Sequence, residues 1–177
     1  MKRTVANVTI ECVEGDITDQ QGIDAVANAA NAQLRPGGGV AGAIHSAAGP
    51  ELDRACRPLA PIGPGEAVIT PAFNLPNKHV LHCLGPVYGR DEPSADLLAS
   101  CYRAALELAD ENELESVAFC SISTGVFGYP MADAARVAIK TAAETAPRLR
   151  HVRLIRFVLW GRDALAAHER ALEALSP

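Results

Sequence analysis

The chain has 177 residues, of which 49% are hydrophobic and 21% are charged, and its formal net charge is −5. This length fits one domain and the apolar share supplies a buried core, so we expect a single domain over residues 1–177 rather than a disordered chain. The acidic balance argues against a general nucleic-acid binder, which would carry a basic face.

We expect no leader peptide, membrane span or disulfide framework. Met1 to Arg3 are followed by a mixed polar stretch, and no run approaches the ~18 apolar residues of a membrane span. We therefore expect a soluble cytoplasmic protein with no membrane partner. The cysteines Cys12, Cys56, Cys83, Cys101 and Cys120 are odd in number and scattered without a CxxC spacing, so we expect neither a zinc ribbon nor a disulfide frame. Four of them lie within apolar or helix-like stretches, where we expect buried free thiols.

The first half of the chain reads as short strands around one small helix. Apolar or β-branched runs between turn signals predict strands at 8–13, 25–28, 67–70 and 80–84. A glycine cluster at 37–42 precedes a helix of small residues over 43–48, which we expect to end at Gly49 and Pro50.

The second half alternates longer helices with strands. Apolar residues recur at three- and four-residue steps over 94–112 and predict an amphipathic helix with Ser94 as its N-cap. Strands are predicted at 117–122 and 152–160, and helices at 131–145 and 164–175. This alternation predicts an α/β sandwich with helices on both faces of a sheet.

Turn residues concentrate in loops that each follow a predicted strand. The segments are Gly15-Asp16-Ile17-Thr18, then Asn28-Ala29-Ala30-Asn31 with Pro36 to Gly42, and Ser123 to Pro130. Because open α/β sheets bind ligands beyond the carboxyl ends of their strands, we expect these loops to meet at one crevice.

The two glycine-rich loops suit a diphosphate. Glycines let backbone N–H groups approach phosphate oxygens, and each loop leads into a helix N-terminus, which adds partial positive charge. The alternative is that the glycines only make tight turns. A Rossmann oxidoreductase is disfavoured although Gly37 to Gly42 matches GxGxxG, because eight residues separate Asn28 from Gly37 and the strand at 67–70 ends without a carboxylate.

Four segments in this order resemble the macrodomain family, in its deacetylase and mono-ADP-ribosylhydrolase branch. They are Gly15-Asp16-Ile17-Thr18, Asn28-Ala29-Ala30-Asn31, Gly37 to His45, and Ile122 to Pro130. The resemblance implies a three-layer α/β/α fold with a central mixed, largely parallel sheet. It also implies binding of ADP-ribose or an ADP-ribosylated protein, with O-acetyl-ADP-ribose as a further substrate and no cofactor or metal. An ADP-ribosylated end is the one nucleic-acid partner left open.

The resemblance also implies residue roles. Asp16 would accept a hydrogen bond from the adenine amino group, Asn31 would bind the distal ribose hydroxyls, and Phe127 would lie against that ribose. Backbone N–H groups of residues 123–126 would bind phosphate, and Asn28 would stabilise its own loop. The implied catalytic residues are Asn31 and Phe127, and the implied ligand-binding set is Asp16, Ile17, Asn31, Gly37, Gly38, Gly39, Val40, Ala41, Ser123, Thr124, Gly125, Val126, Phe127 and Trp160.

At three positions the sequence allows both a structural and a functional interpretation. Trp160 ends the last strand, near where the family places an adenine-packing residue, but a core tryptophan is as good an interpretation. His45 is read as a hydrogen-bonded helix histidine, with contact to the distal ribose as the alternative. His82 and Cys83 are neighbours on a strand, so their side chains point to opposite faces and zinc binding with His79 is disfavoured.

One residue departs from the pattern of the branch. Ala41 stands where the branch usually has an aspartate that activates or orients water, and losing a general base costs ~10²–10⁴ in rate. The Gly-Gly-Gly-Val-Ala-Gly form is similar to that of viral macrodomains, where a water held by substrate phosphate and loop amides would attack. We therefore expect hydrolysis by positioning and electrostatics, with a non-catalytic ADP-ribose reader as the alternative.

Overall fold

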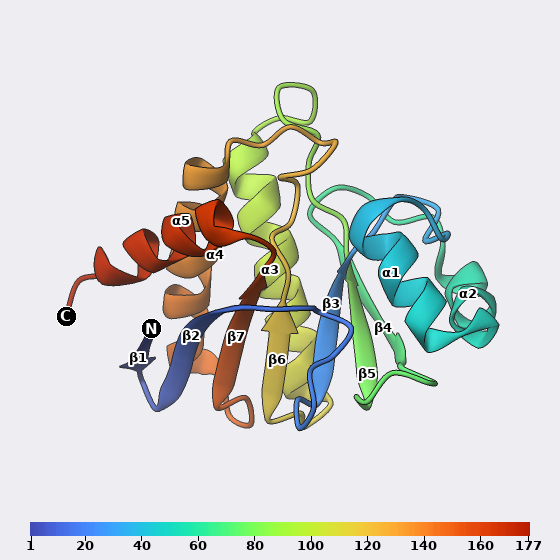
Figure 1. Cartoon of the computed structure of the whole chain (residues 1–177), viewed down its shortest axis with the longest axis horizontal. Helices are drawn as coiled ribbons and strands as arrows, with labels where there is room; N and C mark the ends of the chain where they lie inside the picture. Colours follow the sequence, from blue (N-terminus) through green and yellow to red (C-terminus); the bar gives the residue numbers. More distant parts are fainter.

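The protein, described over residues 1–177 by a computed structural model, is built on one seven-stranded sheet (Figure 1). The strand order is β1-β2-β7-β6-β3-β5-β4. The edge strands β1 and β4 are antiparallel to their neighbours and all other pairs are parallel, which confirms the mixed, largely parallel sheet. The strands are β1 (Lys2–Val5), β2 (Val8–Glu14), β3 (Ala25–Ala29), β4 (Ala67–Pro71), β5 (His79–Cys83), β6 (Ser116–Phe119) and β7 (Leu154–Leu159).

Helices cover both faces of this sheet, so the predicted three layers are present. On one face, the side chain of His82 in β5 meets Cys56 of α2. On the other, Phe157 in β7 lies against Tyr102 of α3 and His168 of α5. α4 packs between α3 and α5, and α1 packs beside α2. The helices are α1 (Gly39–Ala48), α2 (Pro50–Cys56), α3 (Ser94–Glu111), α4 (Met131–Thr145) and α5 (Arg162–Glu173), with 3₁₀ turns at Arg57–Leu59 and Ala146–Arg148.

Two elements were not predicted, β1 and α2. Gly49, with φ 90°, ends α1 as expected, but Pro50 then begins a second helix. Proline is well suited to a first helical position because its ring fixes φ and its missing N–H would have no partner there.

The N-cap prediction for Ser94 is wrong. Ser94 is the first residue of α3 and Pro93 is the cap. The Ser94 hydroxyl donates backwards to the carbonyl of Asp91 at 2.6 Å, and the Ser94 N–H donates to the Glu92 carboxylate at 3.2 Å. Glutamate therefore meets the first open N–H of the helix.

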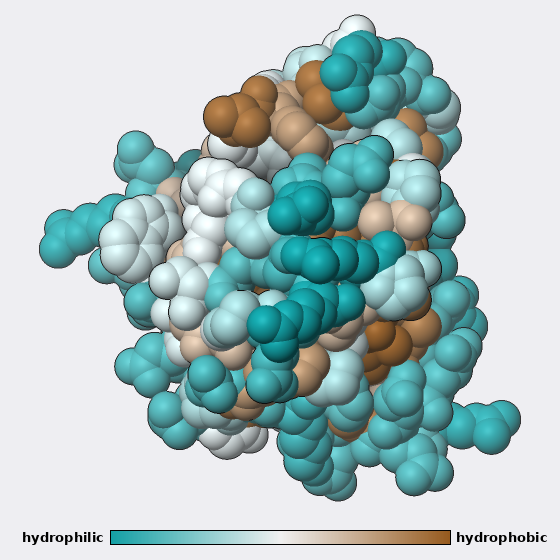
Figure 2. All heavy atoms as spheres, turned by 90° about the vertical axis from the view of Figure 1, so that its right-hand side faces the viewer, coloured by the Kyte–Doolittle hydropathy of each residue, from teal (hydrophilic) through white to brown (hydrophobic).

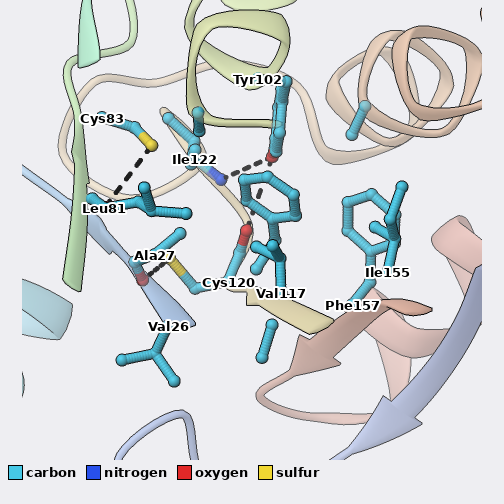
Figure 3. Close-up of a cluster of buried hydrophobic side chains, with 14 of the residues drawn as sticks. Val26, Ala27, Leu81, Cys83, Tyr102, Val117, Cys120, Ile122, Ile155 and Phe157 are labelled. Atoms are coloured by element: carbon cyan, nitrogen blue, oxygen red, sulfur yellow. Dashed lines mark hydrogen bonds between the residues drawn. The ribbon is translucent and has the colours of Figure 1, made fainter. Parts of the chain in front are cut away.

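β6 is shorter than predicted, because residues 120–122 already belong to the loop that follows it. In Figure 3, the buried Tyr102 of α3 lies against this segment. The Tyr102 oxygen accepts the N–H of Ile122 at 3.1 Å, and its hydroxyl donates to the carbonyl of Cys120 at 3.5 Å. The ring stacks edge-on against Phe119, so the aromatic core also fixes where the loop begins.

All five cysteines are buried free thiols, which confirms the prediction made for four of them. Burial raises the pKa of Cys101 and of Cys120 to about 12, so neither carries useful thiolate near neutral pH. The side of the molecule beyond α2 and β4 is mostly hydrophilic, with separate small hydrophobic patches (Figure 2). None of the helices combines the length and apolar character needed to cross a membrane.

Candidate functional site

A two-lobed cleft lies beyond the carboxyl ends of the central strands, where the predicted loops meet. The larger lobe, about 460 Å³, is lined by Asp16, Ile17 and Trp160 among others, and we call it the Trp160 lobe. The smaller, about 360 Å³, contains Phe127 and is called the Phe127 lobe. The lobes share Gly39, Val40, Ser121 and Gly125, so they form one continuous cleft.

The first side of the cleft is the start of α1. Its first-turn N–H groups, Gly39 to Ala41, have no hydrogen-bond partner in the chain, as expected for a helix N-terminus without a side-chain cap. The loop before it is closely folded, because a Cβ at Gly42 would lie 2.2 Å from the carbonyl oxygen of Gly37. Only glycine allows this approach, which holds the open N–H groups in place.

The second side is the loop from Ser121 to Tyr129. No backbone N–H from Ser123 to Val126 is hydrogen-bonded within the chain. The loop is nevertheless fixed, since the Tyr129 N–H donates to the carbonyl of Ser123 at 2.9 Å and the Gly128 N–H donates to that of Gly125 at 3.0 Å. Both sides of the cleft thus present backbone donors on rigid supports, a pattern that suits an anion.

The cleft carries almost no charge of its own. No lysine, arginine or histidine lines either lobe, and Asp16 is the one charged side chain that does. Hydrogen bonds from the Thr18 hydroxyl and backbone N–H to Asp16 Oδ1, at 2.7 and 2.8 Å, hold the pKa of Asp16 below its ordinary value. Its Oδ2 has no partner in the chain and remains an available acceptor.

Trp160 stands at the rim of its lobe with 83% of its surface exposed. The interpretation of Trp160 as a core residue is therefore wrong. Val126, on the opposite loop, is also fully exposed. Large apolar side chains left in water beside a cleft are typical of a ligand-binding edge.

The comparisons with known proteins agree with this geometry. Residues 27–138 match the macro domain. The chain belongs to the macro domain family. Similar curated proteins include a macro domain-containing protein of Chlorobaculum tepidum, 46% identical over 95% of this chain and 98% of that protein. Another is the O-acetyl-ADP-ribose deacetylase of Salmonella gallinarum, 44% identical over 92% of this chain and 93% of that protein.

Solved structures give the same family. The Oceanobacillus iheyensis macrodomain with ADP superposes with a TM-score of 0.93 at 39% identity, covering 98% of this chain and 94% of that one. The Trypanosoma brucei macrodomain in complex with ADP-ribose gives a TM-score of 0.86 at 38% identity, covering 92% of this chain and 68% of that one. The macrodomain fold of the present chain is thereby established.

Most of the predicted ligand-binding residues line the cleft of this macrodomain. Three do not, Asn31, Gly37 and Ala41. The Asn31 amide instead closes a turn, with Nδ2 donating to the carbonyl of Arg35 at 2.8 Å and Oδ1 accepting the Arg35 N–H at 3.0 Å. Ala41 is buried within the first turn of α1.

The turn at Asn31 is tied to α2. The Arg35 guanidinium donates through Nε to Asp53 at 2.9 Å, and Arg57 pairs with the other oxygen of the same carboxylate at 2.9 Å. Asp53 therefore holds Arg35 outside the cleft, and these ion pairs connect α2 to the turn that precedes the Gly37 to Gly42 segment.

Two histidines and Asn28 form a buried polar cluster that the sequence did not predict. Asn28 does not stabilise its loop, because its Nδ2 donates to Nδ1 of His82 across the sheet at 3.2 Å. His45 lies with its ring 6.4 Å from that of His82, and neither of its nitrogens has a hydrogen-bond partner, so the prediction of a hydrogen-bonded helix histidine is wrong. The structure contains no group of three or more side chains arranged to hold a metal ion.

Several residues outside the predicted ligand-binding set also line the cleft, some of them within the loops that we expected to meet there. They are small or apolar groups at strand ends and on helix faces, namely Gly15, Ala29, Ala30, Ala43, Cys83, Gly85, Cys120, Ser121, Ile122, Met131, Val158 and Ala164. Gly85 carried a signal as a strand-ending glycine, and the structure gives its reason, since a Cβ there would lie 2.1 Å from Ser123 Oγ.

Proposed function

We propose that this macrodomain binds ADP-ribose in the cleft and hydrolyses an ester at the distal ribose. The substrates would be mono-ADP-ribose on acidic side chains of proteins, O-acetyl-ADP-ribose, or both. One observation carries the proposal. Two runs of unpaired backbone N–H groups, at Gly39 to Ala41 and Ser123 to Val126, border one cleft between a lobe with Asp16 and Trp160 and a lobe with Phe127.

The chemistry of each part fits one part of the ligand. The adenine would pack on Trp160, and Asp16 Oδ2 would accept from its amino group, which distinguishes adenine from a base with a carbonyl there. The diphosphate would lie between the two sets of N–H groups, where the N-terminus of α1 adds partial positive charge. The distal ribose would then occupy the Phe127 lobe.

Hydrolysis in this site would depend on positioning. Water would add its oxygen to the carbonyl carbon of the ester, and the bond from that carbon to the ribose oxygen would break. One proton of the water would pass to the ribose oxygen and the other would stay on the new carboxylic acid, leaving a free ribose hydroxyl. Asn31 still has one amide hydrogen and one acceptor lone pair beyond its bonds to Arg35, and these suit a ribose diol. Cys120 lines the Trp160 lobe, but its raised pKa argues against a thiolate nucleophile.

Similar proteins support the ligand and the reaction. A relative 44% identical is an O-acetyl-ADP-ribose deacetylase, and two solved macrodomains at 38% and 39% identity hold ADP-ribose and ADP. Calorimetric titration of the purified protein with ADP-ribose, with ADP and NAD as controls, tests the binding step. We expect ADP-ribose to bind most tightly. No heat with millimolar ADP-ribose would refute the proposal.

A pure ADP-ribose reader is the second candidate. It is favoured by one observation, that Asp16 is the only charged side chain lining the cleft and lies in the lobe opposite Phe127. Single-turnover incubation with a glutamyl-ADP-ribosylated protein separates the two. We expect release of the label, and slower release from Asn31→Ala at similar ADP affinity. Binding without release at high protein and long times would identify a reader.

A further inference from the structure

Ser123 combines two features that a structural serine rarely shows. Its backbone is in the left-handed region, with φ 67°, although it is not a glycine. Its side chain is 6% exposed, and its buried Oγ has no hydrogen-bond partner in the chain. Strained backbone and unpaired buried polar groups both cost free energy, and both concentrate at functional sites.

The neighbouring hydroxyls of Ser121 and Thr124 both have hydrogen-bond partners. The Thr124 hydroxyl donates to Ser121 Oγ at 2.9 Å, and the Ser121 hydroxyl donates to the sulfur of Met131 at 3.6 Å. Among the serine and threonine hydroxyls of this loop, only that of Ser123 is left unpaired, although it is packed so closely that a Cβ on Gly85 would lie 2.1 Å from it. The hydroxyls on either side of Ser123 in this segment therefore have partners, and that of Ser123 has none.

The position of Ser123 decides what this hydroxyl can meet. Ser123 and Gly85 line the Phe127 lobe and do not line the Trp160 lobe, whereas Thr124 lines the Trp160 lobe alone. A serine hydroxyl moves between three staggered positions by rotation about one bond. A rotation about the Cα–Cβ bond of Ser123 would move Oγ away from Gly85. The open space next to the side chain is the Phe127 lobe, which Ser123 lines.

We infer that Ser123 is a specificity-determining residue, whose hydroxyl turns into the Phe127 lobe and donates a hydrogen bond to an oxygen of the distal ribose. This inference rests on the proposed binding of ADP-ribose. ADP lacks that ribose, so the hydroxyl distinguishes ADP-ribose from ADP. Because it is unpaired in the free protein, it gives up no protein partner on binding, and the ligand relieves an existing cost.

Two substitutions separate the hydroxyl from the backbone. Ser123→Ala removes the hydroxyl and keeps a side chain, and Ser123→Gly removes it and also relieves the left-handed strain. For both we expect ADP-ribose affinity, measured by calorimetry, to fall about three- to tenfold, the range of one net hydrogen bond, with ADP affinity unchanged. The thermal midpoint of the free proteins should not fall, because no bond is lost.

Thr124→Ala is the matched control, since it removes the adjacent hydroxyl from the other lobe and should change both affinities by the same factor. The inference is overturned if the Ser123 variants weaken ADP and ADP-ribose equally, or weaken neither. A wild-type protein that binds ADP-ribose while the Ser123 variants behave like it refutes this inference alone. A wild-type protein that binds neither ligand refutes the proposed function and the inference with it.

Discussion

Lowering the pH from 8 to 5 should destabilise this protein through one buried histidine. His82 is fully buried. Asn28 Nδ2 can only donate, so His82 Nδ1 accepts at 3.2 Å, and the ring hydrogen on Nε2 is donated to the Thr70 hydroxyl at 2.9 Å. A proton added at Nδ1 would face the hydrogens of Asn28. Burial first, and then the nearby His45, lower the pKa of His82 from 6.5 to about 3.

The direction and size of this change in the free energy of unfolding follow from the difference between the pKa of His82 in the folded and in the unfolded protein. Between about pH 3 and 6.5 the unfolded chain binds a proton at His82 that the folded protein does not, so the free energy of unfolding rises with pH in this window. The stabilisation is fully present above the unfolded pKa and is lost as the pH falls below it. At pH 5 the loss from His82 is about 2 kcal/mol, set by the unfolded pKa of ~6.5.

Urea unfolding of the wild type and His82→Gln at pH 8 and pH 5 measures this loss. Comparing the two pH values within each protein cancels the packing cost of the substitution. His45, whose pKa burial also lowers, is present in both proteins and its contribution cancels as well. We expect the wild type to lose about 2 kcal/mol more than the variant. Equal losses would show that His82 is protonated in the folded protein and that the assignment of its partners is wrong.

Three further changes test the cleft. Trp160→Ala should weaken ADP-ribose binding roughly tenfold with a stability change within ~0.5 kcal/mol, because the ring is exposed, and wild-type tryptophan fluorescence should change on binding since this is the only tryptophan. Asp16→Ala should abolish the preference for ADP-ribose over its inosine counterpart, measured as a ratio of dissociation constants. Gly42→Ala should weaken ADP and ADP-ribose alike, because its Cβ would press the Gly37 carbonyl and displace the loop; unchanged titrations would contradict this.

The sequence predicted the central sheet because each inner strand is a short apolar run between turn signals. β1 was not predicted because Lys2 to Val5 is a short edge strand that begins with two charged residues, so its sequence has no clear alternation of apolar and polar residues. α2 escaped because its seven residues give fewer than two turns of periodicity, and its opening proline reads as the end of the previous helix. Both elements are short and are stabilised by packing against other segments, β1 against β2 and α2 against α1 and β4.

The sequence predicted the parts of the site that the backbone forms better than the parts that depend on contacts between side chains. Glycine loops after parallel strands meet at one edge whatever their side chains do, so both sides of the cleft followed from the order of motifs. The pairing of Asn28 with His82 depends on side-chain directions between distant segments, and the pairing of Asn31 with Arg35 depends on the exact turn between them; the sequence pattern specifies neither. The unpaired Ser123 hydroxyl belongs to the same class.

A cleft that holds a diphosphate through backbone dipoles should respond to salt in the opposite sense from a basic one. A site made of lysine and arginine loses affinity as salt screens attraction, but here no basic side chain lines the cleft and the net charge is −5. Salt would screen only the long-range repulsion between an acidic protein and an anionic ligand, while the close N–H contacts are little affected. Raising NaCl from 50 to 500 mM should therefore leave the ADP-ribose dissociation constant within about twofold, or lower it. A steep loss of affinity with salt would mean that arginine or lysine from outside the described lining, such as Arg35, binds the phosphates instead.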